Sequence, residues 1–174
     1  YLLEAGGTFE GSLRGATVLE LGSGVGLLGL SLAGSARARG ARVVVTDRDA
    51  GILRHNCEAN RAVFAANGEA TCTARELDWD RPALLLETDR PVDWILGADV
   101  LYNSNTAAPL FRTLCMLIPP ENTTSQFLLC YKPRDTAAES HFFELLGQAD
   151  PPFASLATHS SGKHTVYHIQ RRAV

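Results

Sequence analysis

The sequence predicts an α/β protein with a mostly parallel sheet that ends in an antiparallel hairpin. Two observations support this class. First, short apolar runs typical of buried strands alternate along the chain with longer segments of helical composition. Second, the alternation stops after Pro151 and Pro152, where two strand-like segments are separated only by the turn-forming residues Ser160, Ser161 and Gly162. Such a link is too short for a helix, so we expect the last two strands to pair directly.

The individual elements follow from runs of apolar and β-branched residues and from longer segments of helical composition. We predict strands at residues 16–21, 42–46, 71–77, 92–98, 126–131, 153–158 and 165–170. We predict helices at residues 27–39, 50–65, 106–117 and 137–146. With 174 residues, of which 45% are hydrophobic, the chain is long enough for one domain with a substantial core.

The composition excludes several classes of partner. A net charge of -3 lacks the positive excess of a nucleic-acid-binding domain, and no apolar run reaches the length of a membrane span. We therefore expect no nucleic-acid partner, no membrane partner and a monomer. The four cysteines form no C-x-x-C pair, which predicts reduced, buried thiols and a location in the cytoplasm or the nucleus. His164 and His168 lie in a strand-like setting and lack companion metal ligands, so we expect exposed side chains and no metal site.

A glycine-rich loop from Gly22 to Gly26 joins the first predicted strand to the first predicted helix. Glycines permit a tight turn and a close approach to a ligand, and the helix offers unpaired N–H groups. A dinucleotide would place its pyrophosphate there, whereas S-adenosylmethionine would place its amino-acid end and sulfonium nearby. Gly24, Gly26 and Gly29 satisfy the G-x-G-x-x-G spacing of dinucleotide-binding proteins, which keeps a nicotinamide-dependent oxidoreductase as an alternative.

Two features of this loop favour the sulfonium cofactor. The frame Gly22, Gly24 and Gly26 puts its first glycine directly after the strand, so Gly29 lies within the helix, where it would serve packing. Glu20 precedes the first glycine by two residues, and its carboxylate would attract a cation and repel a pyrophosphate.

A second acid, Asp47, closes the second predicted strand, about twenty residues beyond the loop, where a carboxylate can accept the protons of both ribose hydroxyls. Asp47 fits either class of cofactor. A glycine turn without any ligand is the plainer alternative, and the combination of the loop with two acids argues against it.

Two later motifs narrow the choice. Leu-Asp-Trp at 77–79 follows the third predicted strand, and Asp-Val-Leu-Tyr at 99–102 follows the fourth. Together with residues 18–27, they resemble the seven-β-strand protein-lysine methyltransferases, called methyltransferase family 16, over residues 16–102. Later stretches are similar to the members that act on the valosin-containing chaperone ATPase, at residues 130–134, 142–146 and 166–169. The resemblance implies a Rossmann-like class I methyltransferase fold with a seven-stranded sheet, S-adenosylmethionine as cofactor, and a protein substrate that carries the acceptor lysine.

The resemblance also implies which residues contact the cofactor. They lie at or just after the carboxyl ends of four predicted strands and comprise Gly22, Ser23, Gly24, Asp47, Trp79 and Ala98. Glu20 and Gly26 join them as candidate cofactor residues of the glycine loop. Trp79 would pack against the adenine, with Asp78 near its exocyclic amine, and a place in the core is the plainer alternative for Trp79. We expect Trp94, which lies in the middle of a strand, in the core.

Asp99 and Tyr102 match the D-x-x-Y element of the family, at the carboxyl end of the fourth strand, where such sheets bind ligands. A lysine attacks a methyl group only as the neutral amine, although its ordinary pKa is about 10.4. An aspartate orients the ammonium group but keeps the proton on it, whereas desolvation and the sulfonium charge favour the neutral amine. We therefore expect Asp99 to position the amine, with water as a route for its proton, and Tyr102 to form an aromatic wall. A helix cap is the plainer alternative for Asp99.

We expect residues 1–174 to form a single methyltransferase domain that lacks its native N-terminal segment. The chain opens at Tyr1 within a stretch that has the composition of a helix end, residues 1–5, and its one Met is Met116. The resemblance implies an upstream segment with a Trp that helps to close the cofactor pocket. A missing segment keeps a non-catalytic protein-binding module as an alternative. A small-molecule methyltransferase would share the same cofactor site.

Overall fold

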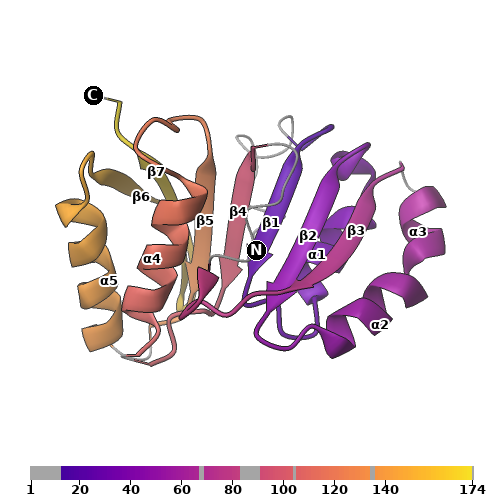
Figure 1. Cartoon of the computed structure of the whole chain (residues 1–174), viewed down its shortest axis with the longest axis horizontal. Coiled ribbons are helices and arrows are strands. Elements are labelled where there is room, and N and C mark those ends of the chain that lie inside the picture. Colours follow the sequence, from indigo (N-terminus) through magenta and orange to yellow (C-terminus); the bar gives the residue numbers. More distant parts are fainter. Residues whose placement is uncertain (1–12, 67–68, 83–90, 104, 134–135, 174) are drawn as a thin grey trace.

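The computed structural model describes residues 13–66, 69–82, 91–103, 105–133 and 136–173, and its seven strands form one sheet (Figure 1). The strands are β1 Thr17–Leu21, β2 Arg42–Asp47, β3 Thr71–Glu76, β4 Trp94–Ala98, β5 Gln126–Tyr131, β6 Phe153–Ser161 and β7 His164–Arg171. Their order is β3-β2-β1-β4-β5-β7-β6. The first five strands pair in parallel, and β7 runs antiparallel between β5 and β6. The predicted mostly parallel sheet with a C-terminal hairpin is therefore confirmed.

Helices cover both faces of this sheet (Figure 1). They are α1 Leu27–Ala33, the short 3-10 helix η1 Ala36–Ala38, α2 Gly51–Ala59, α3 Arg61–Ala66, α4 Ala107–Leu117 and α5 Thr136–Gln148. Apolar residues of α1, α2 and α3 pack on one face, and those of α4 and α5 pack on the other. None of the helices in these described parts combines the length and the apolar composition that a membrane crossing requires.

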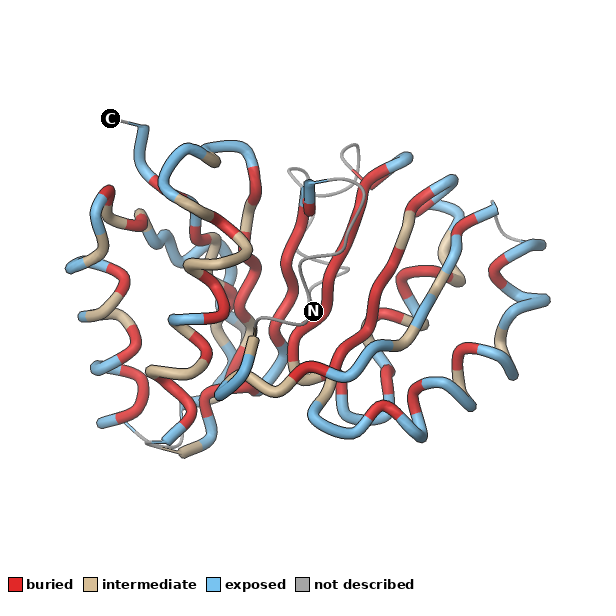
Figure 2. Tube along the Cα trace, viewed as in Figure 1, coloured by how far each residue is buried: buried red, intermediate tan, exposed pale blue. Residues whose placement is uncertain are grey.

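The central strand β1 shows why the sheet needs both layers. All five of its residues are buried, and Figure 2 shows that most of the neighbouring strands β2 and β4 is buried as well. Val18 belongs to the core under α1 and α2, whereas Leu19 belongs to the core under α4 and α5. Because successive side chains point to opposite faces, an apolar run in a parallel sheet is buried on both sides.

The strand order reverses at β1, which pairs with β2 on one side and with β4 on the other. The connections that leave the carboxyl ends of β1 and β4 therefore diverge to opposite faces of the sheet. This divergence opens a crevice at the switch point, and the fold thereby brings the glycine loop next to residues 99–102.

Two predicted helices are shorter than expected. The predicted helix at 27–39 ends at Ala33, because the chain turns at Gly34 and Ser35 caps η1 by accepting a hydrogen bond from the Arg37 N–H at 3.3 Å. The predicted helix at 50–65 divides into α2 and α3 at Asn60. The Asn60 side chain donates to the Asn56 carbonyl oxygen at 2.8 Å, a local bond that competes with regular helix geometry.

The C-terminal hairpin is longer than predicted, because Ser160 and Ser161 continue β6 and the turn contracts to Gly162 and Lys163. The expectation of an exposed His168 is wrong. His168 is half-buried and stacks on Trp94, with ring centroids 6.1 Å apart, since β7 lies inside the sheet next to β5. Trp94 itself is buried, as predicted. The predicted helix end at residues 1–5 lies outside the described residues.

Gly29 in α1 faces the sheet at a point that has no room for a side chain. A methyl group on Gly29 would clash with the Cγ1 atom of Val45 in β2 and would lie 2.7 Å from Oε2 of Glu20 in β1. Both neighbours are buried. The predicted packing role of Gly29 is therefore confirmed.

Replacing Gly29 with Ala is expected to lower the free energy of unfolding by about 1–3 kcal/mol, because the added methyl group overpacks the interface of α1 with the sheet. Urea unfolding followed by circular dichroism measures this change. Gly147 in α5 is the matched control, since no atom lies within 4 Å of a methyl group placed there. Gly147→Ala is expected to leave stability unchanged or to raise it by up to about 1 kcal/mol. Equal effects of the two substitutions would contradict this account.

Candidate active site

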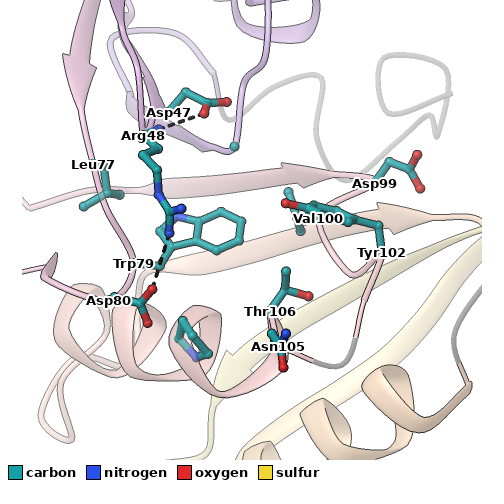
Figure 3. Close-up of a pocket in the computed structure, with 12 residues that line it drawn as sticks. Asp47, Arg48, Leu77, Trp79, Asp80, Asp99, Val100, Tyr102, Asn105 and Thr106 are labelled. Carbon is teal, nitrogen blue, oxygen red and sulfur yellow. Dashed lines mark hydrogen bonds and ion pairs between the residues drawn. The ribbon is translucent and has the colours of Figure 1, made fainter.

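A cavity of about 320 Å³ lies at the carboxyl ends of the central strands (Figure 3). This volume is at the lower end of the range of roughly 300–1,000 Å³ typical of small-molecule sites. Five segments of the chain line the cavity: Gly22 after β1; Asp47 and Arg48 at the end of β2; Leu77, Trp79 and Asp80 after β3; Asp99, Val100 and Tyr102 after β4; and Asn105, Thr106 and Pro109 at the start of α4. The cavity occupies the crevice that the reversal of strand order creates.

Gly22 makes the close approach on which the floor of the cavity depends. Its φ angle is +63°, and a side chain there would place Cβ 3.0 Å from Cγ1 of Val100 and 3.2 Å from Cζ2 of Trp79. A residue with a side chain would therefore be strained and would push both neighbours outward. Glycine keeps the loop in contact with the two residues that follow β3 and β4.

Ser23 fastens the glycine loop to β2. Its N–H donates to the Thr46 carbonyl oxygen at 2.8 Å, and its Oγ accepts the Thr46 N–H at 3.0 Å. The Thr46 hydroxyl donates in turn to the Glu20 carbonyl oxygen at 2.6 Å. Ser23 is buried and does not line the cavity. Its predicted contact with a cofactor stays a prediction. In the structure, its hydrogen bonds hold the glycine loop against β2.

Asp47 lines the cavity with a carboxylate that is already oriented. Oδ2 accepts the Gly24 N–H at 2.8 Å, and Oδ1 accepts the Arg48 N–H at 2.7 Å. Each carboxylate oxygen can accept more than one hydrogen bond. Asp47 can therefore also accept hydroxyl protons from a ligand without leaving its position.

Glu20 lies under the loop and is 3% exposed. Its Oε2 accepts the Gly29 N–H at 3.0 Å, at the start of α1. Burial raises the pKa of Glu20 to about 7, and hydrogen bonds from Ser23 and from the Gly29 N–H offset only part of this effect. Neither Glu20 nor Gly26 lines the cavity, so their predicted contacts with a cofactor stay predictions.

Trp79 forms one wall of the cavity and packs against the core under α4 and α5. The preceding Asp78 does not line the cavity; its Oδ1 accepts the Asp80 N–H at 3.0 Å and pairs with Nη2 of Arg48 at 3.3 Å. The bond from the Asp80 N–H and the guanidinium of Arg48 hold the pKa of Asp78 below its usual range. Asp78 is thus a charged acceptor beside the Trp79 wall.

Asp99 and Tyr102 lie at the other end of the cavity from Arg48 and Trp79 (Figure 3). Asp99 has a φ angle of +59°, a conformation that non-glycine residues rarely adopt and that clusters at functional sites. Its N–H donates to the Cys130 carbonyl oxygen at 2.7 Å, which fixes the backbone as it leaves β4. Ala98, one residue earlier, is exposed at the end of β4.

Sequence reasoning missed several lining residues, among them Arg48, Asp80 and Thr106. Arg48 directly follows Asp47, and Asp80 directly follows Trp79. Their positions next to predicted site residues could therefore have indicated them. Thr106 lies at the start of α4, and no motif marks this position. Of the predicted residues, the structure brings Gly22, Asp47, Trp79, Asp99 and Tyr102 together around one cavity.

Comparison with known proteins decides the family. The family model described as lysine methyltransferase matches residues 1–149. The chain belongs to the lysine methyltransferase family. This match confirms the family resemblance that the motifs at 77–79 and 99–102 indicated.

The names of individual relatives agree with membership of this chain in the lysine methyltransferase family. The chain is 38% identical to protein N-lysine methyltransferase METTL21A of Mus musculus over 106 residues, which cover 59% of the chain and 44% of that protein. It is 32% identical to EEF1A lysine methyltransferase 3 of Xenopus tropicalis over 133 residues, which cover 75% of the chain and 53% of that protein. The chain spans about half the length of the curated relatives that it matches.

Solved structures agree on the fold. A SAM-dependent methyltransferase from Aquifex aeolicus superposes with a TM-score of 0.64 at 18% identity, covering 97% of this chain and 87% of that one. A predicted O-methyltransferase from Agrobacterium tumefaciens superposes with a TM-score of 0.66 at 16% identity, covering 99% of this chain and 80% of that one. The lysine methyltransferase family chain therefore has the class I methyltransferase fold.

The raised pKa of Glu20 predicts a pH-dependent stability. Its folded-state pKa of about 7 lies above the ordinary 4.5, so folding takes up a proton between these values. The stabilising contribution is complete below about pH 4.5 and is lost as the pH rises through about 7. Relative to Glu20→Gln, whose amide oxygen can still accept the Gly29 N–H, the wild type is expected to lose on the order of 3 kcal/mol over this window.

Urea unfolding of both proteins at several pH values between 4.5 and 8 measures this difference. The comparison with Glu20→Gln cancels the titration of the other acids. A difference in unfolding free energy that stays constant across the window would show that Glu20 is ionised in the folded protein.

Proposed function

We propose that this chain carries the S-adenosylmethionine site and the acceptor site of a protein-lysine N-methyltransferase. One observation carries the proposal: Asp47 and Trp79 lie at one end of a single cavity, and Asp99 and Tyr102 lie at the other. The first pair suits a nucleoside, and the second suits an incoming cation. Membership of the lysine methyltransferase family and relatives named for protein lysine methylation support the same function.

The residues around the cavity fit this cofactor. The Asp47 carboxylate is held by two backbone N–H groups and has acceptor capacity left for ribose hydroxyls. The Trp79 ring offers a flat apolar surface for an adenine. Gly22 keeps the floor of the cavity free of a side chain. When bound, S-adenosylmethionine supplies an electrophilic methyl group on a positively charged sulfur.

In this proposal, Asp99 binds and orients the lysine side chain. A carboxylate at the mouth of the cavity attracts an ammonium group and forms a charge-assisted hydrogen bond with it. The fixed backbone of Asp99, bonded to the Cys130 carbonyl oxygen, limits the directions from which the amine can approach. Alignment of the reacting groups supplies much of the acceleration in such a displacement.

The proton must leave before the amine can attack. Asp99 is exposed, so water can reach its carboxylate and take the proton away. Tyr102 is 57% exposed and stands beside Asp99, where its ring forms an aromatic wall along the approach of the amine. These two side chains therefore bind the cation first and leave a route for its proton.

We further propose that residues 1–174 form a single methyltransferase domain with a protein partner that carries the acceptor lysine. The similarity to members that act on the valosin-containing chaperone ATPase stays a prediction for this partner. A location in the cytoplasm or the nucleus is proposed because all four cysteines are free, with Cys57 buried and the other three half-buried.

Asp99→Asn is expected to reduce methyl transfer about ten- to hundred-fold, because it removes a charged hydrogen bond to the lysine. Asparagine tolerates the positive φ angle of this position, so the fold is expected to persist. The measurement follows transfer of a radiolabelled methyl group from S-adenosylmethionine to proteins of a cell extract, with amino-acid analysis for methyllysine. Calorimetry on the same variant is expected to show S-adenosylhomocysteine binding within about two-fold of the wild type.

The paired measurements separate the two parts of the proposal. Unchanged turnover by Asp99→Asn would contradict its role at the acceptor. Labelled methyl groups on small molecules of the extract, with none on protein lysine, would show a small-molecule methyltransferase instead.

A further inference from the structure

Four charged side chains form a network along the rim of the cavity, which we call the rim network: Arg48, Asp78, Asp80 and Arg112. Nη2 of Arg48 lies 3.3 Å from Oδ1 of Asp78 and 3.3 Å from Oδ2 of Asp80. Nη2 of Arg112 lies 3.5 Å from Oδ1 of Asp80. The two acids thus alternate with the two arginines, and Arg48 touches both acids.

The rim network joins three segments that are far apart in the sequence. Arg48 follows β2, Asp78 and Asp80 follow β3, and Arg112 belongs to α4. Each of these segments also supplies residues that line the cavity. Figure 3 shows the side chain of Arg48 reaching from Asp47 to Asp80, on the Trp79 side of the cavity.

Trp79 is the residue that this arrangement constrains. It stands between the two acids in sequence, so a guanidinium that holds both of them fixes the chain on either side of the indole. The backbone N–H of Arg48 also donates to Oδ1 of Asp47. The backbone of Arg48 therefore donates to Asp47, the proposed ribose acceptor. Its side chain contacts the two acids on either side of Trp79, the proposed adenine wall.

We propose that Arg48 is a positioning residue for the nucleoside end of the cofactor, acting through Asp78 and Asp80 on the loop that carries Trp79. This inference rests on the proposed function. Side-chain exposures of 73% for Arg48, 39% for Asp78 and 57% for Asp80 mean that the ion pairs add little to folding stability. Their effect lies in pre-organisation, because a wall held in place before binding does not have to be ordered by the ligand.

The test compares two arginines that make similar ion pairs at different distances from the cavity. Arg54 in α2 pairs with Glu76 in β3 at 3.0 Å, with side-chain exposures of 56% and 59%. This pair also joins a segment after β2 to the β3 region, but neither residue lines the cavity. Arg54→Met is therefore the matched control for Arg48→Met.

Quenching of Trp fluorescence by S-adenosylhomocysteine gives the Kd of each protein. Arg48→Met is expected to raise the Kd about five-fold, whereas Arg54→Met is expected to leave it unchanged. Asp80→Asn is expected to weaken binding as well, and the double variant of Arg48 and Asp80 is expected to show less than the product of the two losses, because both act in one network.

Two further readouts separate positioning from a general loss of structure. Between about 0.05 and about 0.5 M NaCl, the Kd of the wild type is expected to rise and that of Arg48→Met to stay level, since salt screens exposed ion pairs. The nucleoside fragment 5′-methylthioadenosine is expected to lose affinity for Arg48→Met by the same factor as S-adenosylhomocysteine, because both ligands share the end that Trp79 faces.

Several results would overturn the inference. Equal losses in Arg48→Met and Arg54→Met would indicate a general effect of surface charge, and unchanged binding by Arg48→Met would remove the positioning role while leaving the proposed function intact. A loss for S-adenosylhomocysteine without a loss for the nucleoside fragment would place Arg48 at the amino-acid end instead. A wild-type protein that binds neither ligand would overturn the inference together with the proposed function.

Discussion

The hydrogen bonds that tie the glycine loop to the end of β2 are the constraint on which the site depends. Ser23 and Thr46 exchange backbone and hydroxyl bonds, and the Gly24 N–H donates to Asp47. Because these bonds hold the turn after β1 against β2, Gly22 lies close to Trp79, which follows β3, and to Val100, which follows β4. The glycine loop therefore forms the floor of the cavity, and the residues that form its walls pack against this loop.

Strand positions were predictable because burial on both faces leaves mostly apolar runs, as in β1 and β5, whose bounds differ from the prediction by at most one residue. Helix ends were less predictable, because side-chain hydrogen bonds to the backbone compete there with the regular hydrogen bonds of the helix. Composition alone favours a helix through 27–39 and another through 50–65, but side-chain bonds from Ser35 and Asn60 to the backbone change the path of the chain. The longer hairpin depends on cross-strand pairing of Ser160 with Thr165, which composition does not reveal.

The site was predictable where a motif fixes a residue at the end of a strand, as for Asp47 and Asp99, because the carboxyl ends of parallel strands meet at one edge. The sequence could not show that the Glu20 carboxylate accepts a hydrogen bond from the Gly29 N–H of α1, since this depends on which face of β1 the side chain takes. It could not reveal the ion pairs of Arg48 either. The bonds of Arg48 to Asp78 and Asp80 cross 30 and 32 residues of sequence and exist only because β2 and β3 are neighbours.

The most direct test of the account is a calorimetric titration of S-adenosylhomocysteine and, separately, of NAD⁺ into the wild-type protein, with Asp47→Ala as the control. We expect one S-adenosylhomocysteine bound per chain, a large loss of affinity in the control, and no heat of binding from NAD⁺. Binding of NAD⁺ in place of S-adenosylhomocysteine would contradict the account, and so would a folded wild-type protein that binds neither.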